Sequence, residues 1–207
     1  CLSALYVDTG AMFRGVAFYA HQRGIDLSDE NSLGDFLTTI DFRYGDKKKL
    51  VSINGTDLTE IIREHSVSSL ASQVSRLSVV RNFLLGVQRQ LAKERLCVME
   101  GRDIGTVVFP HAFCKCFLTA SPEVRAKRRW LELQQRGETH HQLSAIYEDI
   151  VARDAADAGR DIAPLKQAHD ALLVDTSQDS VDAVVEKVCC LARERGAACE
   201  IGRASCR

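Results

Sequence analysis

Short apolar runs alternate along the chain with longer stretches in which apolar residues recur every three or four positions. The runs have the length of buried strands, and the longer stretches have the spacing of amphipathic helices. Such alternation predicts an α/β fold, a parallel sheet with helices on both faces. The strands that we expect are Leu5–Val7, Leu96–Met99, Lys115–Leu118 and Ala171–Val174.

Helices are expected in the amphipathic stretches that follow these strands. The clearest start is Ser121-Pro122-Glu123, with serine as the N-cap, proline at the first helical position and an acid in the first turn. Gly137 gives the matching stop. The predicted helices are 10–22, 122–136, 143–155 and 181–195.

One stretch departs from this alternation. Residues 42–58 contain short β-prone runs separated by Gly45-Asp46 and Asn54-Gly55, which are typical of hairpin turns. We interpret the lysine run 47–49 as a solvated turn. The stretch therefore predicts a small antiparallel β insert within the α/β domain.

Composition narrows the functional classes. With 207 residues and 45% hydrophobic content, the chain can bury a full core, and one domain is the default expectation. The net charge of −1 gives no indication of nucleic-acid binding. No apolar run approaches the roughly 18 residues of a membrane span, and we see no signal peptide pattern. We therefore expect neither a nucleic acid nor a membrane as a partner.

Eight cysteines raise the question of disulfides or zinc. Cys114 and Cys116 are separated by one residue, Cys189 and Cys190 are adjacent, and no C-x-x-C pair exists. We interpret them as reduced thiols of a cytoplasmic protein, with no metal site.

The chemically most informative run is EGRDIGTVVFP, residues 100–110, which directly follows a predicted strand. Open α/β sheets place their ligands at the carboxyl ends of strands. A second run, DTGAMFR at residues 8–14, follows the first predicted strand in the same way. Two strand ends that each carry an arginine predict a phosphorylated small molecule as the ligand.

A nucleoside monophosphate makes specific demands on its site. Its phosphate dianion favours arginine forks, and a carboxylate can accept from its ribose hydroxyls. Cytosine offers an amine suited to aspartate and acceptors suited to arginine or serine; uracil reverses this pattern, so an Asp–Arg pair can separate the two bases. We expect the required side chains in loops and at helix starts. They are Arg14, Ser72, Arg81, Arg102, Asp103, Arg153, Asp157 and Arg160.

The small residues of the run 153–160 suit a mobile segment that closes over phosphates.

Five runs resemble the bacterial-type cytidylate kinases, the (d)CMP kinase family. They are DTGAMFRG, ASQVSRLSVVR, EGRDIGTVVFP, KCFLTASPEVRAKRRWLE and RDAADAGRDIAPL. The stretch Gly55–Thr59 followed by Ile62-Arg63 is similar to that family's small β insert, and the resemblance extends from about Tyr6 to Ala192.

The resemblance implies a P-loop nucleoside-monophosphate-kinase-like fold and phosphoryl transfer from ATP, with Mg²⁺, to CMP or dCMP. It implies a kinase domain over residues 1–199, with a CMP-binding insert at 41–64 and a lid at 144–165. We expect a cytoplasmic monomer whose partners are small nucleotides.

Roles on the acceptor follow from the resemblance residue by residue. Arg14 and Arg102 would hold the CMP phosphate. Arg160 and Thr9 would help them. Phe13 stands where the family usually has tyrosine and would lie against the nucleotide.

The base and the sugar would be held by a second group of residues. Ser72, Arg81 and Asp103 would read cytosine. Arg153 and Asp157 would hold the ribose hydroxyls, in agreement with the carboxylate expected above.

Catalysis would fall to arginines. Arg128 and Arg129 lie where similar kinases present positive charge to the transferring phosphoryl group, and Arg153 completes the predicted catalytic set. The dense charge on this helix leaves two alternatives open, a solvated face or a phosphate contact. Ala156 stands where the family usually has a further arginine in the lid, and losing such a contact can slow transfer by orders of magnitude.

The sequence contains no G-x-x-x-x-G-K-[ST] loop, which this class uses to cradle the ATP phosphates. We expect an incomplete reading frame that lacks the first strand and the P-loop. A catalytically inactive CMP-binding fragment is one alternative; a kinase for AMP or dephospho-CoA is another, which Asp103 and Arg81 disfavour.

The tail 200–207, read back into codons, fits a common sequencing adapter, and we interpret it as an assembly artefact.

Overall fold

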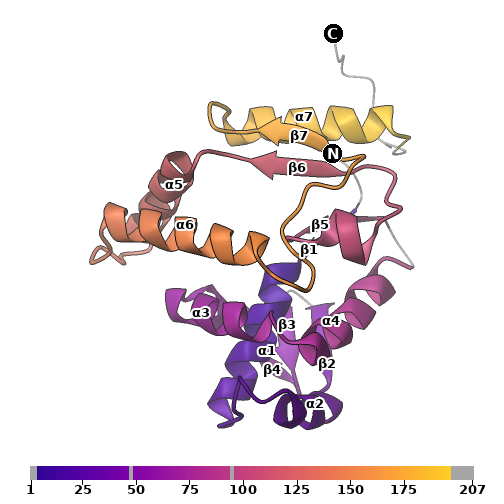
Figure 1. Cartoon of the computed structure of the whole chain (residues 1–207), viewed down its shortest axis with the longest axis vertical. Coiled ribbons are helices and arrows are strands. Elements are labelled where there is room, and N and C mark those ends of the chain that lie inside the picture. The colour runs from indigo at the N-terminus through magenta and orange to yellow at the C-terminus, as the bar shows by residue number, and fades with distance from the viewer. Residues whose placement is uncertain (1–3, 47–48, 94–95, 197–207) are drawn as a thin grey trace. The chain divides into compact units, whose positions relative to one another are not determined.

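The computed structural model describes residues 4–46, 49–93 and 96–196. The chain forms two compact units, an N-terminal unit (Ala4–Gly101) and a C-terminal unit (residues 102–196), and Figure 1 shows the elements of each. The expectation of one kinase domain over 1–199 stays a prediction. Part of the predicted lysine turn, Lys47 and Lys48, lies outside the described residues, as do Cys1, Cys199, Cys206 and the tail 200–207.

In the N-terminal unit, two predicted strands pair in parallel. Strand β1 (Leu5–Asp8) lies beside β5 (Cys97–Glu100), in a register that places Asp8 opposite Glu100. Helix α1 (Thr9–Gln22) follows β1 without an intervening loop, because the Asp8 side chain accepts the Ala11 N–H and caps the helix. The strand and helix predictions are confirmed here.

The predicted antiparallel insert is also present. Strands β2 (Phe42–Asp46), β3 (Lys49–Ile53) and β4 (Thr56–Asp57) form one sheet in that order. Asn54 and Gly55 have φ angles of 49° and 78°, so the turn between β3 and β4 has the two left-handed residues that Asn-Gly favours. The Gly45 φ of 70° marks a further left-handed position at the end of β2.

Three helices of this unit were not predicted. Helices α3 and α4 begin after Glu64 and Leu77, neither of which gives a side-chain cap, so the usual sequence signal for a helix start is missing. Tertiary packing, which a local pattern does not reveal, stabilises them. The three helices are α2 (Glu30–Thr38), α3 (His65–Val74) and α4 (Ser78–Leu91).

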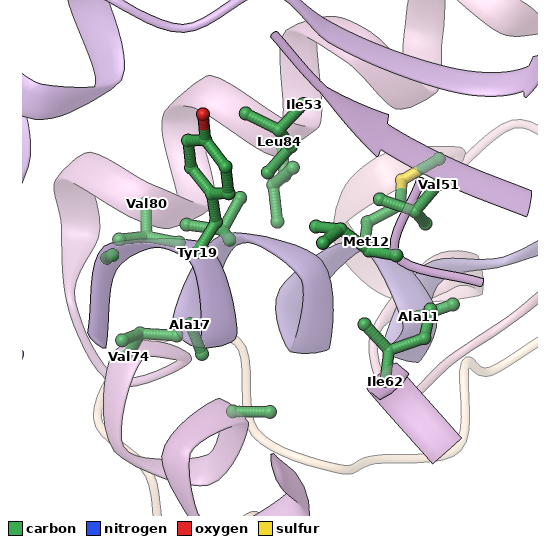
Figure 2. Packing of buried hydrophobic residues seen from close by; sticks show 14 of the residues in the cluster. Ala11, Met12, Ala17, Tyr19, Val51, Ile53, Ile62, Val74, Val80 and Leu84 are labelled. Carbon is green, nitrogen blue, oxygen red and sulfur yellow. The ribbon is translucent and has the colours of Figure 1, made fainter. Parts of the chain in front are cut away.

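The core of the N-terminal unit surrounds α1, which packs against α3, α4 and β3. Figure 2 shows side chains from these elements pointing into one cluster, among them Met12, Tyr19 and Val51. Gly15 allows α1 to approach β3 closely, since a Cβ at this position would lie 2.6 Å from Val51 Cγ1. The helix that carries Arg14 is therefore fixed by packing on several sides.

The C-terminal unit contains the other two predicted strands, β6 (Cys116–Thr119) and β7 (Leu172–Asp175), which pair in parallel. The parallel strands of the described residues thus form two pairs, where the sequence predicted one sheet. The predicted helices are confirmed, with α6 three residues longer than expected; α5 and α6 pack through Ala126, Leu133 and Ile146. These helices are α5 (Pro122–Gln135), α6 (Leu143–Ala158) and α7 (Val181–Glu194).

Among the described residues, no helix combines the length and the apolar character that crossing a membrane requires.

Two glycines in helices test the packing of α1. We expect Gly15→Ala to lower the free energy of unfolding by about 1–3 kcal/mol, because the new methyl group overlaps Val51 in a filled core. Gly86→Ala in α4 is the matched control: nothing lies within 4 Å of its Cβ, so the change should stabilise the protein by about 0.5–1 kcal/mol. Urea unfolding measures both. Equal stability of the two variants would contradict the close α1–β3 contact.

Candidate functional site

Asp8 and Arg14 form a mostly buried ion pair at the end of β1. Asp8 Oδ2 accepts a hydrogen bond of 2.8 Å from Arg14 Nη2, while Oδ1 accepts the Ala11 N–H at 2.9 Å. Gly10 lies between them: a Cβ there would be 3.0 Å from Arg14 Nη1 and 3.1 Å from Asp8 Oδ1. The glycine of the DTGAMFR run therefore leaves room for the carboxylate to hold the guanidinium.

The Nε–H of Arg14 is buried and has no hydrogen-bond acceptor among the described residues. A buried donor without a partner is costly, and most such groups in native proteins are satisfied. An anion with several acceptor oxygens, such as a phosphate group, would satisfy it. The arrangement thus fits the predicted role of Arg14 as a phosphate ligand.

Thr9 is buried at the first position of α1, and its hydroxyl donates to the Glu100 carbonyl at 2.7 Å. Its single donor hydrogen is therefore used to join the start of α1 to the end of β5. The predicted contact of Thr9 with a phosphate stays a prediction, and in this arrangement the hydroxyl has no second hydrogen to donate.

Phe13 and Arg81, both predicted to contact the nucleotide, lie together. The Arg81 guanidinium carbon is 5.6 Å from the centre of the Phe13 ring, within cation–π range. Arg81 also donates to the Ser75 carbonyl at 2.9 Å, and the Ser75 hydroxyl donates to the Ser72 carbonyl at 2.9 Å. A short network thus connects Ser72 and Arg81, the two predicted base contacts of this unit.

In the C-terminal unit, the side chain of Asp157 is 1% exposed and lies among three arginines. Its Oδ2 accepts from Arg102 Nε at 2.8 Å, its Oδ1 accepts from Arg160 Nη2, and Arg153 Nε lies 4.0 Å from Oδ2. One carboxylate balances one of these three positive charges. The Asp157 cluster, defined as these four residues, is therefore positively charged and electrostatically suited to bind an anion.

The local setting of several site residues differs from the prediction. Arg14 lies in the second turn of α1 and Ser72 lies in α3, where loops or helix starts were expected. Arg153 and Asp157 both belong to α6, which is helical to Ala158; the helix predicted over 143–155 contained Arg153 but ended before Asp157. The small residues of this run are mostly alanines, which favour helix more than any other residue. Because Arg153 and Asp157 are four positions apart in this helix, they lie on one face of it.

Asp103 is buried and starts a π-helical turn, Ile104–Val108, that the sequence did not predict. The Asp103 carbonyl accepts the N–H of Val107 at 2.9 Å and that of Val108 at 3.3 Å. Such single wide turns are rare and are often found at functional sites. The specific geometry of the GRDIGTVVFP run therefore lies in its backbone as well as in its charged pair.

Lys115 holds the end of this turn and was missed by sequence reasoning. Its buried Nζ donates to the Pro110 carbonyl at 2.5 Å and to both carboxylate oxygens of Asp170 at 2.8 Å. This hydrogen bond holds the pKa of Asp170 below its ordinary value. Because Lys115 and Asp170 are 55 positions apart, no local spacing could have indicated the contact.

The predicted catalytic arginines of α5 both have partners within the protein. Arg128 donates to the Thr176 carbonyl at 2.6 Å, to its hydroxyl at 3.2 Å and to the Asp179 carbonyl at 3.3 Å. Arg129 pairs with Glu132 at 2.9 Å. Arg128 thus holds the segment that follows β7 through hydrogen bonds. A phosphate contact for either arginine stays a prediction.

Comparison with known proteins agrees with this arrangement of motifs. The family model for cytidylate kinase matches residues 1–194. The chain belongs to the cytidylate kinase family. The resemblance seen in the five runs is thereby confirmed, and with it the membership of a family of phosphotransferases.

Several curated relatives show the extent of this similarity. The cytidylate kinase of Syntrophotalea carbinolica is 44% identical over 196 residues, which are 94% of this chain and 83% of the relative. That of Lactobacillus gasseri is 41% identical over 189 residues, 90% of this chain and 82% of the relative. That of Pseudomonas syringae pv. tomato is 41% identical over 187 residues, which are 88% of this chain and 81% of the relative.

The buried position of Asp157 leads to a stability prediction. We expect Asp157→Asn to lower the free energy of unfolding by about 3 kcal/mol or more, because three arginines lose a buried counter-charge. Asp154→Asn is the control on the same helix: its pair with Arg125 is about one-third exposed, and the cost should be about 1 kcal/mol or less. Chemical denaturation of both variants is the measurement. Similar losses of unfolding free energy in the two variants would refute the role of Asp157 as the buried counter-charge of the three arginines.

The Lys115–Asp170 pair predicts a pH dependence. Because the pKa of folded Asp170 lies below the ordinary value of 3.8, its charged form stabilises the fold above that pH. This contribution is lost as the pH falls through the lower folded pKa. The difference in melting temperature between wild type and Asp170→Asn should therefore shrink below pH 3.8. A constant difference from pH 7 to pH 3 would argue against it.

Proposed function

We propose that the protein transfers a phosphoryl group from ATP to CMP or dCMP, giving CDP or dCDP. Family membership supports the reaction class. The observation that carries the proposal is the Asp157 cluster, in which three arginines share one buried carboxylate. Such an excess of guanidinium groups is the chemistry that binds phosphate.

The acceptor phosphate is assigned to Arg14, Arg102 and Arg160. In the N-terminal unit, Arg14 offers its buried Nε–H, for which the described residues supply no acceptor. In the C-terminal unit, Arg102 and Arg160 are oriented by Asp157. Fixed guanidinium groups bind an anion without first losing rotamer freedom, which favours affinity.

Selection of cytosine is assigned to Ser72, Arg81 and Asp103. A carboxylate accepts from the exocyclic amine of cytosine, whereas uracil has a carbonyl oxygen there and would be repelled. The guanidinium of Arg81 lies beside the Phe13 ring and donates to the Ser75 carbonyl, so it is held next to another residue that is assigned to the nucleotide. These assignments support CMP over UMP.

The ribose is assigned to Arg153 and Asp157. An ionised carboxylate has about four acceptor positions, and the arginines Arg102 and Arg160 take one each at short distance. Acceptor capacity therefore remains for a sugar hydroxyl. The side chain of Arg153 is 45% exposed, and its Nε lies 4.0 Å from Oδ2 of Asp157.

In the transfer step, an oxygen of the acceptor phosphate bonds to the γ-phosphorus while the bond to the β,γ-bridging oxygen breaks and ADP leaves. No covalent intermediate is needed, because positioning and charge stabilisation supply most of the catalysis. Arg128, Arg129 and Arg153 are the proposed sources of positive charge. Ala156 contributes none, although the resembling kinases usually have arginine at its position.

ATP is proposed to carry Mg²⁺, which neutralises charge on the transferring phosphates in this reaction class. The described residues contain no cluster of three His, Cys, Asp or Glu side chains suited to a metal ion. The sequence contains no G-x-x-x-x-G-K-[ST] loop. We therefore assign neither the donor phosphates nor the ion to residues of this chain.

A second candidate function is binding of CMP without transfer. The two functions differ in one measurable way, CMP-dependent formation of ADP.

We further propose that the protein acts in the cytoplasm as a monomer.

Asp103 provides the test of the substrate. In calorimetric titrations of the full chain we expect CMP to bind more tightly than UMP or AMP. Asp103→Ala should weaken CMP binding about tenfold and reduce the CMP/UMP ratio, since one base contact accounts for roughly 1–3 kcal/mol of discrimination. Asp182→Ala, at an exposed position of α7, is the control and should bind as wild type.

Equal affinity for CMP, UMP and AMP would exclude the cytosine assignment. A coupled assay for ADP then separates the two candidate functions: CMP binding without CMP-dependent ADP would leave the binding function alone.

A further inference from the structure

Tyr44 reaches from the antiparallel insert to the end of β1. It lies on β2 and is only 8% exposed, in the same core cluster as Val7 and Val51. Its hydroxyl oxygen accepts a hydrogen bond of 2.7 Å from the backbone N–H of Asp8. A side chain 36 positions away in sequence thus holds the residue at which strand turns into helix.

Asp8 is held at each of its polar ends. Its N–H is bound to Tyr44, its Oδ1 to the Ala11 N–H and its Oδ2 to Arg14. The first of these contacts fixes the backbone, and the other two transmit that position to α1 and to the guanidinium. Since Arg14 Nη2 donates to Asp8 Oδ2 at 2.8 Å, a shift of Asp8 would move the guanidinium of Arg14.

We propose that Tyr44 is a positioning residue for the phosphate-binding arginine: through Asp8, the insert sets the place of Arg14. The ligand class is a phosphate monoester, and its identification as CMP rests on the proposed function. The insert then contributes to anion binding in this unit without touching the anion.

The hydroxyl suits this task chemically. Burial raises the pKa of Tyr44, and the nearby Asp8 and Glu100 charges add to the effect, so the group stays protonated and neutral at physiological pH. Its oxygen remains an acceptor for the Asp8 N–H, and no charge is introduced beside the Asp8–Arg14 pair. A phenylalanine at this position would keep the ring in the core and remove only the acceptor.

The test compares two buried tyrosines of one core. Tyr44→Phe should weaken binding of CMP to the full chain about five- to tenfold, the size expected when a buried N–H loses its acceptor and Arg14 its fixed position. Tyr19→Phe is the matched control, because it removes a buried hydroxyl whose partner is Arg23. Both changes should lower the melting temperature, and only Tyr44→Phe should change the affinity.

An NMR readout separates positioning from general stability. The Arg14 Nε–H signal, assigned by its loss in Arg14→Lys, should shift when inorganic phosphate is added to the wild type. We expect the same shift in Tyr19→Phe and a much smaller shift in Tyr44→Phe at equal phosphate concentration.

The outcomes distinguish this inference from the proposed function. Failure of the wild type to bind CMP would refute the proposed function, while the phosphate titration would still decide the role of Tyr44. Unchanged affinity and an unchanged Arg14 signal in Tyr44→Phe would overturn the inference, as would a wild-type Arg14 signal that ignores phosphate.

Discussion

The ion pairs between arginine and buried or half-buried aspartate are the interactions on which the candidate sites of this chain depend. Asp8 holds Arg14 in the N-terminal unit, and Asp157 holds Arg102 and Arg160 in the C-terminal unit. A free arginine side chain has about 2 kcal/mol of rotamer entropy to lose when it binds an anion. Because the carboxylates already restrict these side chains, much of that loss occurs on folding and not on binding.

The two arrangements differ in net charge. The Asp8–Arg14 pair is neutral, and what it presents to a ligand is one buried Nε–H without an acceptor among the described residues. The Asp157 cluster has three guanidinium groups for one carboxylate and attracts anions by its excess charge. Coulomb attraction by excess charge contributes only in the second arrangement, so salt should weaken anion binding there more strongly.

The sequence predicted those parts of the fold that local signals determine. Ser121-Pro122 started α5, Asn54-Gly55 turned the insert, and the apolar runs gave all four parallel strands. It missed α3 and α4, which lack capping side chains and depend on contacts with α1. It ended the helix that contains Arg153 at residue 155, although alanine propensity carries α6 to residue 158.

The sequence predicted the residues proposed to contact the nucleotide, but it did not predict the residues that hold those side chains in place. Arg14, Arg102, Asp157 and Arg160 were all named from strand-end runs and from the family resemblance, and the structure places three of them in one cluster. Asp8, Tyr44 and Lys115 were not named, because each acts through a backbone group or through a partner far along the chain. Periodicity reports which face of an element is buried, and it contains no information about such pairings.

The antiparallel insert has a physical role in this chain, because the position of a site residue depends on a side chain that lies far away in the sequence. A two-residue strand such as β4 contributes little stability of its own, yet Val51 and Ile53 of its neighbour β3 are fully buried against α1. That packing makes the insert a rigid extension of the core, which is the condition for holding a side chain to within a fraction of an ångström. Tyr44 lies in register with Val51 on this sheet, so core packing fixes its hydroxyl relative to Asp8. The hydrophobic core then determines the position of Arg14 through two hydrogen bonds. In one, the Asp8 N–H donates to the Tyr44 hydroxyl, and in the other, Arg14 donates to the Asp8 carboxylate.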